Sequence, residues 1–367
     1  MPRPRWPRYF RVLTPPLTTG PPRLAWWRGP ELTCTPFVLL PPPMTTEARL
    51  EQLRRCAADP NAYATLQPGL QYFDHPAGFV AYRRALAGPV VLGDPVAEPA
   101  RLPELLAAFR RAHPRSVFGY LSEAGAAALA RAEGRRLRFV RIGVERCLEL
   151  QREAAFSPAI LGALKKARKA RLEVVERDLN ALTPAEYAQL QAINAQFIRL
   201  SPAKKEIGFI SRALQLAPEP DVRFFVIQAG AEAQPIGFCV LDPWYEGARL
   251  KGYQLHQFRL LPTKIWGVFL SVVATLAEQL RTEGHAALSL GGCIGAACQG
   301  AQPLPASAVY DYCRDTTFRL IDRYHPLTNL SRNKFEFAGP DLPRYLAAPH
   351  RLPLLPLLRL ARANHIL

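Results

Sequence analysis

The chain has 367 residues, 49% of them hydrophobic, and a formal net charge of +17. This length allows two domains with full cores, and the apolar content indicates a globular protein. The positive charge favours polyanionic partners, namely nucleic acid, anionic lipid surfaces and phosphorylated substrates. Seven scattered cysteines without a Cys-x-x-Cys pair are typical of a reducing cytosol and exclude a disulfide framework or a zinc site.

The first 43 residues are rich in proline and arginine, and they contain Trp6, Trp26 and Trp27. Proline at this density excludes regular helix and central strand. The segment also lacks the continuous apolar stretch of a secretion signal. It is either a disordered basic arm that contacts a membrane or RNA, or an artefact of a translation start that belongs at Met44.

Residues 44–155 form the first predicted domain. We expect helices over 45–57, 103–112 and 123–133, and strands over 69–73, 78–84, 89–92, 116–121, 137–142 and 147–150. Strands and helices in this order predict a layered α/β domain.

Residues 156–348 form the second predicted domain. We expect helices over 161–170, 184–200, 207–216 and 264–283, and strands over 172–176, 222–229, 234–242, 250–260 and 287–290. Three antiparallel strands, a long helix and a further strand are the order expected of an acetyltransferase-like (GNAT) core. The fold class is therefore α/β with tandem GNAT-like domains, each a central mixed sheet flanked by helices.

Two apolar segments bear on membrane contact. The most apolar helix candidate, 266–277, has about 12 residues, fewer than the roughly 20 that span a bilayer. The basic and apolar tail, 349–367, either forms a short helix on an anionic membrane or packs onto the core.

The loop before the long helix of the second domain is poorly suited to coenzyme A. Acetyltransferases hold the pyrophosphate of this cofactor with backbone N–H groups of a glycine-rich loop and of the helix N-terminus. Here residues 259–267 contain a single glycine, a proline that removes a donor, and the bulky Trp266. The first domain has no such loop either, so we expect a different donor.

Cations alternate with aromatic residues over 318–347. Arg323, His325, Lys334 and Arg344 are among them. This spacing suits a pocket for an anionic ligand, because rings pack while charges stay oriented. A helix and strand with solvated charges explain the spacing as well.

The chain resembles a known family in several segments that occur in the same order. They are Asn61–Tyr63 with Gln71–Phe73, Phe79–Arg83, Val90–Val96, the basic stretch Leu164–Leu172, Leu288–Gly291, and finally Asn333–Phe337 with Asp341–Ala347. The family is the cytosolic C-terminal domain of bacterial phosphatidylglycerol lysyltransferases (aminoacyl-phosphatidylglycerol synthases) and their soluble relatives. The resemblance covers roughly residues 60–348.

The resemblance implies that the donor is aminoacyl-tRNA and that no cofactor is needed. The acceptor would be a lipid hydroxyl, as in phosphatidylglycerol, or another small acceptor. The catalytic candidates are Lys334, which would stabilise an oxyanion or the 3′-terminal nucleotide, Arg344, which would hold a phosphate, and His256, as a base. No metal site is expected, and the oligomeric state is left open.

A second group of residues is expected to bind substrate. It comprises Arg259, Asp94, Tyr253, Asp311 and the helical cations Lys165, Lys166, Arg168 and Lys169. Each has a structural alternative, such as a turn-forming Asp94, a packed strand residue at 256, or a solvated helix face. The stretch Gly292–Cys298 departs from the proline-containing loop of the lipid-modifying members, so the acceptor stays open.

The leading hypothesis is thus a cytoplasmic aminoacyltransferase, in solution or peripheral on the inner face of the membrane, with charged tRNA and anionic lipid as partners. Two other functions compete with it. One is an N-acyltransferase that uses acyl-coenzyme A. The other is a non-catalytic tandem domain that binds tRNA or an anionic membrane.

Overall fold

The structure is a computed structural model that describes residues 43–86, 88–151, 156–201, 204–206, 208–296, 298, 304, 308–324, 327–349 and 354–365, without the side chains of residues 135, 320, 323, 324 and 327–330. These residues belong to one compact unit, Pro41–Leu367. Both interpretations of the N-terminal extension lie outside the described residues, as do the side chains of Arg323 and His325.

The described helices are α1 (Thr46–Cys56), α2 (Leu102–Ala112), α3 (Glu123–Glu133), α4 (Pro158–Lys169), α5 (Pro184–Leu200), α6 (Val268–Thr282), α7 (Ala308–Tyr324), α8 (Leu327–Phe335) and α9 (Leu354–Ala363), with short 3₁₀ turns η1 (Ala62–Leu66), η2 (Gly134–Arg136) and η3 (Leu179–Ala181). The strands are β1 (Gln71–His75), β2 (Gly78–Arg84), β3 (Pro89–Leu92), β4 (Val96–Ala97), β5 (Val117–Leu121), β6 (Arg138–Glu149), β7 (Glu173–Glu176), β8 (Arg223–Ala229), β9 (Gln234–Glu246), β10 (Arg249–Leu260), β11 (Ala287–Ile294) and β12 (Asp341–Ala348).

The strands form one mixed sheet in the order β1-β2-β3-β5-β12-β6-β11-β10-β9-β8-β7, and β4 pairs with β2. Two pairs, β3–β5 and β10–β11, are parallel, and the other described pairs are antiparallel. Strand β12 comes from the end of the chain but lies between β5 and β6. Strand β6 also pairs with β11, so hydrogen bonds continue from one half of the sheet to the other.

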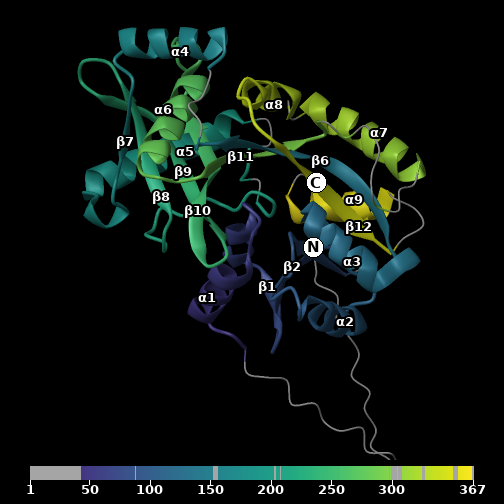
Figure 1. Ribbon diagram of the computed structural model, residues 1–367. Helices are drawn as coiled ribbons and strands as arrows, with labels where there is room; N and C mark the ends of the chain where they lie inside the picture. The colour runs from purple at the N-terminus through teal and green to yellow at the C-terminus, as the bar shows by residue number, and fades with distance from the viewer. Residues whose placement is uncertain are drawn as a thin grey trace, which may run out of the picture. The chain divides into compact units, whose positions relative to one another are not determined.

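The second half has the expected acetyltransferase-like order. Strands β8, β9 and β10 are antiparallel, α6 follows, and β11 returns parallel to β10. Helix α6 buries an apolar stripe that includes Val272, Leu276 and Leu280 against one face of this sheet. Helix α4 packs across the start of α6 (Figure 1). The fold class is therefore confirmed: a mixed sheet flanked by helices.

The opposite face of the same strands is polar and yet buried. Asp242, Gln254 and Gln257 are among the buried polar side chains on it. The segment around η1 and the loop 208–222 cover this face. Gln254 contacts Asn61 beside η1, and Gln257 donates to the Arg212 carbonyl in the loop at 2.7 Å. Buried polar groups are costly without hydrogen-bond partners. We therefore expect the functional side chains of this half to lie in this polar layer.

Some predicted elements are wrong in detail. Residues 208–216 are not a helix, because long-range bonds use their backbone: Gln67 donates to the Phe209 carbonyl at 2.7 Å, and Asn364 accepts from the Ile210 N–H at 3.1 Å. The two strands predicted over 137–150 are the single strand β6. Gly143 allows this continuity, since a Cβ there would lie 2.5 Å from the Cys293 carbonyl oxygen of β11.

Helix α9, in the C-terminal tail, packs onto the core. It buries Leu357, Leu360 and Ala363. The guanidinium of Arg359 is also buried and donates to the carbonyls of Ala85 and Pro89. This supports the packed alternative for the tail. In the part of the chain that the structure describes, no helix combines the length and the apolar character needed to cross a membrane.

Candidate active site

Strands β10 and β11 diverge in the middle of the sheet. They pair in parallel over only three residues each, 252–254 with 287–289, although β10 runs on to Leu260 and β11 to Ile294. Lys334, from α8, lies at this divergence. Its Nζ donates to the Gly292 carbonyl at 3.0 Å and lies 3.6 Å from where a Cβ of residue 291 would be. The Lys334 ammonium therefore lies at β11, where this strand separates from β10.

Four neighbouring strands are irregular at the same level of the sheet. The register shifts place an extra residue at His256 in β10, between Ser289 and Gly292 in β11, at Ile142 in β6, and around Tyr120 in β5. Tyr120 has a φ of +62°, which is strained for an aromatic residue. Bulges re-aim side chains and cluster next to active sites, so their coincidence marks this region as the candidate site.

Arg344, from β12, is at the centre of a buried ion cluster. Its side chain is 0% exposed, and Nε and Nη2 donate to Glu145 Oε2 at 3.0 and 2.6 Å. The third nitrogen, Nη1, is bonded to Asp59. All three nitrogens thus have carboxylate partners, and the phosphate contact expected of this residue stays a prediction.

Glu145 is the most connected carboxylate in the cluster. Besides Arg344 it accepts hydrogen bonds from the Tyr120 hydroxyl at 2.9 Å, from Gln254 Nε2 at 2.8 Å and from the Ser289 hydroxyl. Burial alone would raise its pKa, but the Arg344 guanidinium and these hydrogen bonds lower the pKa of Glu145 below its ordinary value. Glu145 is therefore an anion at neutral pH.

The charges of the cluster are not balanced. Burial raises the pKa of Asp59 to about 7, although the Arg344 guanidinium opposes this shift. Two amide atoms beside the cluster, Asn61 Nδ2 and Gln254 Oε1, are buried without a hydrogen-bond partner in the structure. A site that binds a polar group has such unfilled capacity, whereas a purely structural cluster rarely does.

Lys334 is nearly as buried as the cluster, at 7% exposure. Burial lowers the pKa of its ammonium, while Cys293 and Glu145 act in the opposite direction. No described carboxylate lies within ion-pair distance of Nζ. An ammonium held this way can attract a negative charge that develops on a substrate.

His256 lies beside a second buried ion cluster. Arg212 binds both oxygens of Asp242, at 2.9 and 2.6 Å, and also binds Glu219. The imidazole Nδ1 of His256 is 3.6 Å from Asp242 Oδ2, and the ring is 3% exposed. Burial lowers the pKa of His256 to about 4 despite the Asp242 carboxylate. The imidazole is therefore neutral at pH 7 and can accept a proton.

The other predicted binding residues are dispersed. Arg259 pairs with Glu206 and stacks on Phe197, with the guanidinium carbon 4.6 Å from the ring centroid. Tyr253 is 5% exposed and packs in the core under α6, on the face opposite the polar layer. The structure thus brings Arg259 to the polar face with His256 and keeps Tyr253 away from it.

Asp94 and Asp311 both have local partners. The carboxylate of Asp94 accepts from the backbone N–H of Ser122 at 2.9 Å and from its hydroxyl, beside the start of α3. Asp311 binds Arg314 at 2.5 Å within α7. The contacts of Asp94 match its structural alternative, and the role of both residues in binding stays a prediction.

The cations of α4 lie on the surface. Lys165, Lys166, Arg168 and Lys169 are exposed, whereas Ile160, Ala163 and Ala167 face the core. Lys166 Nζ sits 4.6 Å from the ring centroid of Trp266, which is itself 51% exposed. The basic cluster therefore presents both charge and an aromatic ring to solvent.

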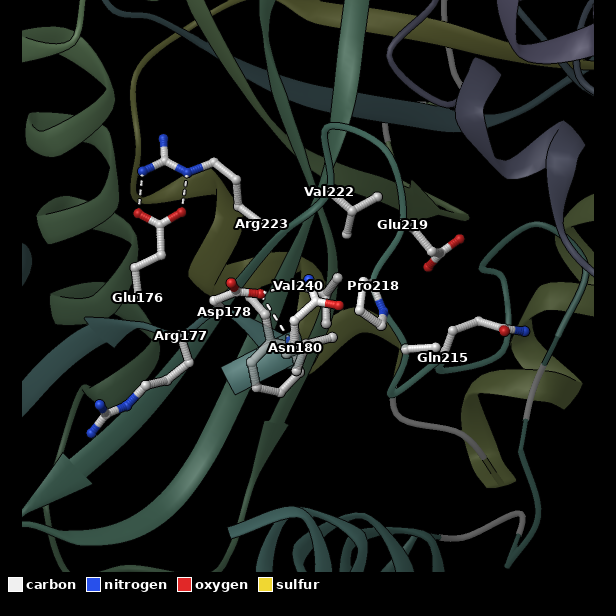
Figure 2. Close-up of a pocket in the computed structure, with 13 residues that line it drawn as sticks. Glu176, Arg177, Asp178, Asn180, Gln215, Pro218, Glu219, Val222, Arg223 and Val240 are labelled. Carbon is white, nitrogen blue, oxygen red and sulfur yellow. Dashed lines mark hydrogen bonds and ion pairs between the residues drawn. The ribbon is translucent and has the colours of Figure 1, made fainter. Parts of the chain in front are cut away.

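A pocket of about 280 Å³ lies elsewhere, between β7, β8 and the loop 215–222 (Figure 2). Glu176 and Arg223 form an ion pair in its wall, and Asp178 accepts from Asn180. None of the predicted site residues lines this pocket. Glu219 does line it, so it adjoins the Arg212 cluster.

Several residues of the candidate site were not recognised in the sequence: Glu145, Ser289, Tyr120 and Asp59. Arg212 and Asp242, of the cluster beside His256, were not recognised either. Glu145 fell in a gap between two predicted strands. Read as one continuous strand, β6 carries an acid at 145 between Val144 and Cys147, a signal that was available. Tyr120 and Ser289 had no comparable signal, because they resemble ordinary strand residues.

Comparison with known families identifies the chain. The profile of "Phosphatidylglycerol lysyltransferase, C-terminal" matches residues 51–348. The chain belongs to this family. The resemblance noted in the sequence is thereby confirmed, and the chain is a transferase. A search of curated protein sequences found no significant match.

Solved structures of other proteins share the fold. L-PGS from Bacillus licheniformis superposes with a TM-score of 0.68 at 16% identity, covering 88% of this chain and 96% of that one. A C-terminal domain ascribed to a lysylphosphatidylglycerol synthetase of Agrobacterium fabrum gives 0.67 at 16% identity, covering 86% and 97%. A conserved protein of unknown function from Bacteroides thetaiotaomicron gives 0.53 at 12% identity, covering 83% and 97%.

Proposed function

We propose that this lysyltransferase-family protein moves an amino acid from aminoacyl-tRNA to the hydroxyl of an anionic phospholipid of the phosphatidylglycerol type, or to another small acceptor. The observation that carries the proposal is the position of Lys334. It comes from the segment that resembles the family, and its buried ammonium lies in the divergence of β10 and β11 without a carboxylate partner among the described residues.

The reaction needs little from the protein, because the amino acid arrives as an activated ester. The acceptor oxygen attacks the ester carbonyl, and negative charge develops on the carbonyl oxygen. The bond from the carbonyl carbon to the ribose oxygen then breaks, and the acceptor's proton ends on that ribose oxygen. Positioning and electrostatic stabilisation supply most of the acceleration in such a transfer.

We assign roles to three side chains. Lys334 stabilises the oxyanion, and the neutral imidazole of His256 carries the proton from the acceptor to the leaving ribose oxygen. Arg344 holds Glu145 and Asp59 and so organises the site from behind. Arg259, on the same face of β10 as His256, adds positive charge for the anionic substrates.

The surface cations Lys165, Lys166, Arg168 and Lys169 of α4 are assigned to phosphates of the tRNA or of the lipid headgroups. Their exposure and the lack of an intervening acid support this role. The protein would then work in the cytoplasm or on the inner face of the membrane.

The loop before α6 supports a donor other than coenzyme A. Pro262 has no N–H, and the N–H of Ile265 already donates to the Thr263 hydroxyl at 3.2 Å. A Cβ on Gly267 would lie 2.7 Å from that of Ala163, so α4 crowds the start of α6. This is the place at which an acetyltransferase holds the pyrophosphate.

The test is a comparison of donors with the full chain. Purified protein is incubated with vesicles that contain phosphatidylglycerol and either a mixture of tRNAs charged with labelled amino acids or labelled acetyl-coenzyme A. We expect label in the lipid fraction with charged tRNA alone. Transfer from acetyl-coenzyme A without transfer from tRNA would contradict the proposal, and tight binding of tRNA or vesicles without turnover would indicate a binding protein.

A further inference from the structure

The carbonyl that holds Lys334 belongs to an unusual piece of strand. Gly291 has a φ of +74°, a conformation that favours glycine, and it lies in the bulge of β11. At Gly292 a side chain has no room, because a Cβ would be 2.4 Å from the Tyr120 hydroxyl oxygen. The position of the Gly292 carbonyl therefore depends on whatever fixes this bulge.

A directed hydrogen-bond chain fixes it. The N–H of Gly291 donates to Ser289 Oγ at 3.0 Å, and the Ser289 hydroxyl donates its one proton to Glu145 Oε1. Because Glu145 is an anion that can only accept, the hydroxyl cannot reverse, and its lone pair stays directed at Gly291. Arg344 and Tyr120 hold the other oxygen of Glu145.

We propose that Ser289 and Glu145 are positioning residues for Lys334, acting through the Gly291–Gly292 bulge, with Tyr120 and Arg344 holding Glu145 in place. This inference rests on the proposed function only in taking Lys334 as the oxyanion-stabilising residue. The chain runs from Arg344 through Glu145, Ser289 and Gly291 to the Gly292 carbonyl, which receives the Lys334 ammonium.

The strain at Tyr120 is consistent with such a device. A tyrosine with φ near +60° is strained and persists only where the surroundings enforce it. The bulge in β5 turns the Tyr120 ring toward Glu145 and Gly292. Its hydroxyl thereby restrains two points of the hydrogen-bond chain at once, the Glu145 carboxylate and the Gly291–Gly292 bulge.

The test uses Ser289→Ala with Ser271→Ala as its matched control. Both serines are fully buried, but the Ser271 hydroxyl donates to the Val268 carbonyl inside α6, away from Lys334. We expect Ser289→Ala to lower kcat for transfer about tenfold or more with KM changed little, since small misplacements of a catalytic group affect the chemical step. Thermal unfolding of both variants reports whether stability differs.

A second variant, Glu145→Gln, keeps the shape and removes the charge. Lys334 acts as a cation, so activity is lost as pH rises through its pKa. Glu145 raises that pKa, and the alkaline limb of kcat should therefore move to lower pH in Glu145→Gln. Tyr120→Phe, which retains the ring against Gly292, should lower kcat less than Ser289→Ala.

The outcomes separate the two proposals. If Ser289→Ala matches Ser271→Ala in kcat and Glu145→Gln leaves the alkaline limb in place, the positioning role is wrong even when Lys334→Ala abolishes transfer. If Lys334→Ala itself retains transfer, the proposed catalytic role of Lys334 is wrong, and the positioning role that depends on it is wrong as well.

Discussion

Two of the buried arginine clusters in the described part of the chain differ in the polar atoms that lie unpartnered beside them. In the Arg212 cluster, one guanidinium binds both oxygens of Asp242 and a second carboxylate, Glu219. In the Arg344 cluster, the same kind of guanidinium binds Glu145 and Asp59, but unpartnered amide atoms of Asn61 and Gln254 lie beside it. The second cluster also adjoins the strained Tyr120 and the bulges of the sheet.

The difference separates a structural clamp from a candidate site. The Arg212 cluster ties the loop 208–222 to β9, because Arg212 and Glu219 lie in the loop and Asp242 lies in the strand. The Arg344 cluster connects, through Ser289 and the bulge of β11, to a lysine that has no carboxylate partner among the described residues. Burial of an arginine alone does not identify function. Unpartnered amide atoms next to a lysine without a carboxylate partner make the Arg344 cluster the candidate, and its role stays a prediction.

The largest effect is expected from Arg212→Met. Removal of the guanidinium leaves the fully buried Asp242 and the partly buried Glu219 without their cation, which costs about 3–5 kcal/mol of the free energy of unfolding. Urea unfolding measures this loss, with Arg199→Met, at an exposed position of α5, as the control. If Arg212→Met were as stable as the control but inactive in transfer, Arg212 would belong to the site and the distinction between the clusters would break.

A smaller effect is expected on the surface of α4. Each lysine near an anionic surface contributes about 1 kcal/mol to binding, so the double variant Lys165→Gln/Lys169→Gln should raise KM roughly thirtyfold with kcat unchanged. Its KM should also depend less on salt. The control is Arg111→Gln/Arg131→Gln, which removes two exposed charges from α2 and α3. Equal KM values for both doubles would exclude α4 from binding.

A further prediction concerns pH and Asp59. Its folded-state pKa is raised from 3.8 to about 7, so the folded protein binds this proton more tightly than the unfolded chain. The associated stability is present at low pH and is lost as pH rises from about 4 to about 7. We expect the melting temperature of the wild type to fall across this window relative to that of Asp59→Asn. If the melting temperatures of the wild type and of Asp59→Asn changed with pH in parallel, Asp59 would not be the group whose pKa is raised.

Much of the fold could be predicted from the sequence. The order of three antiparallel strands, a long helix and a parallel strand follows from local periodicity, and it was found as expected. Lys334, Arg344 and the α4 cations were selected by the resemblance and by charge density. These are properties that neighbouring residues in the chain reveal.

The rest depends on contacts between distant segments. Glu145 meets Arg344 across 199 positions of sequence, and Ser289 meets Glu145 across 144. The bulges that bring them together arise from pairing between strands, which no local pattern specifies. The same reason explains the missed loop at 208–216, whose backbone bonds to side chains far along the chain.

The central claim is that Lys334 acts in the transfer and is not a structural cation. The most direct measurement is single-turnover transfer of labelled amino acid from charged tRNA to phosphatidylglycerol vesicles by Lys334→Ala, with Arg332→Ala on the exposed side of α8 as control. Loss of one electrostatic stabiliser predicts a fall of roughly a hundredfold or more in rate for Lys334→Ala, with an unchanged melting temperature and wild-type transfer by Arg332→Ala. Transfer by Lys334→Ala at the rate of Arg332→Ala would contradict the account.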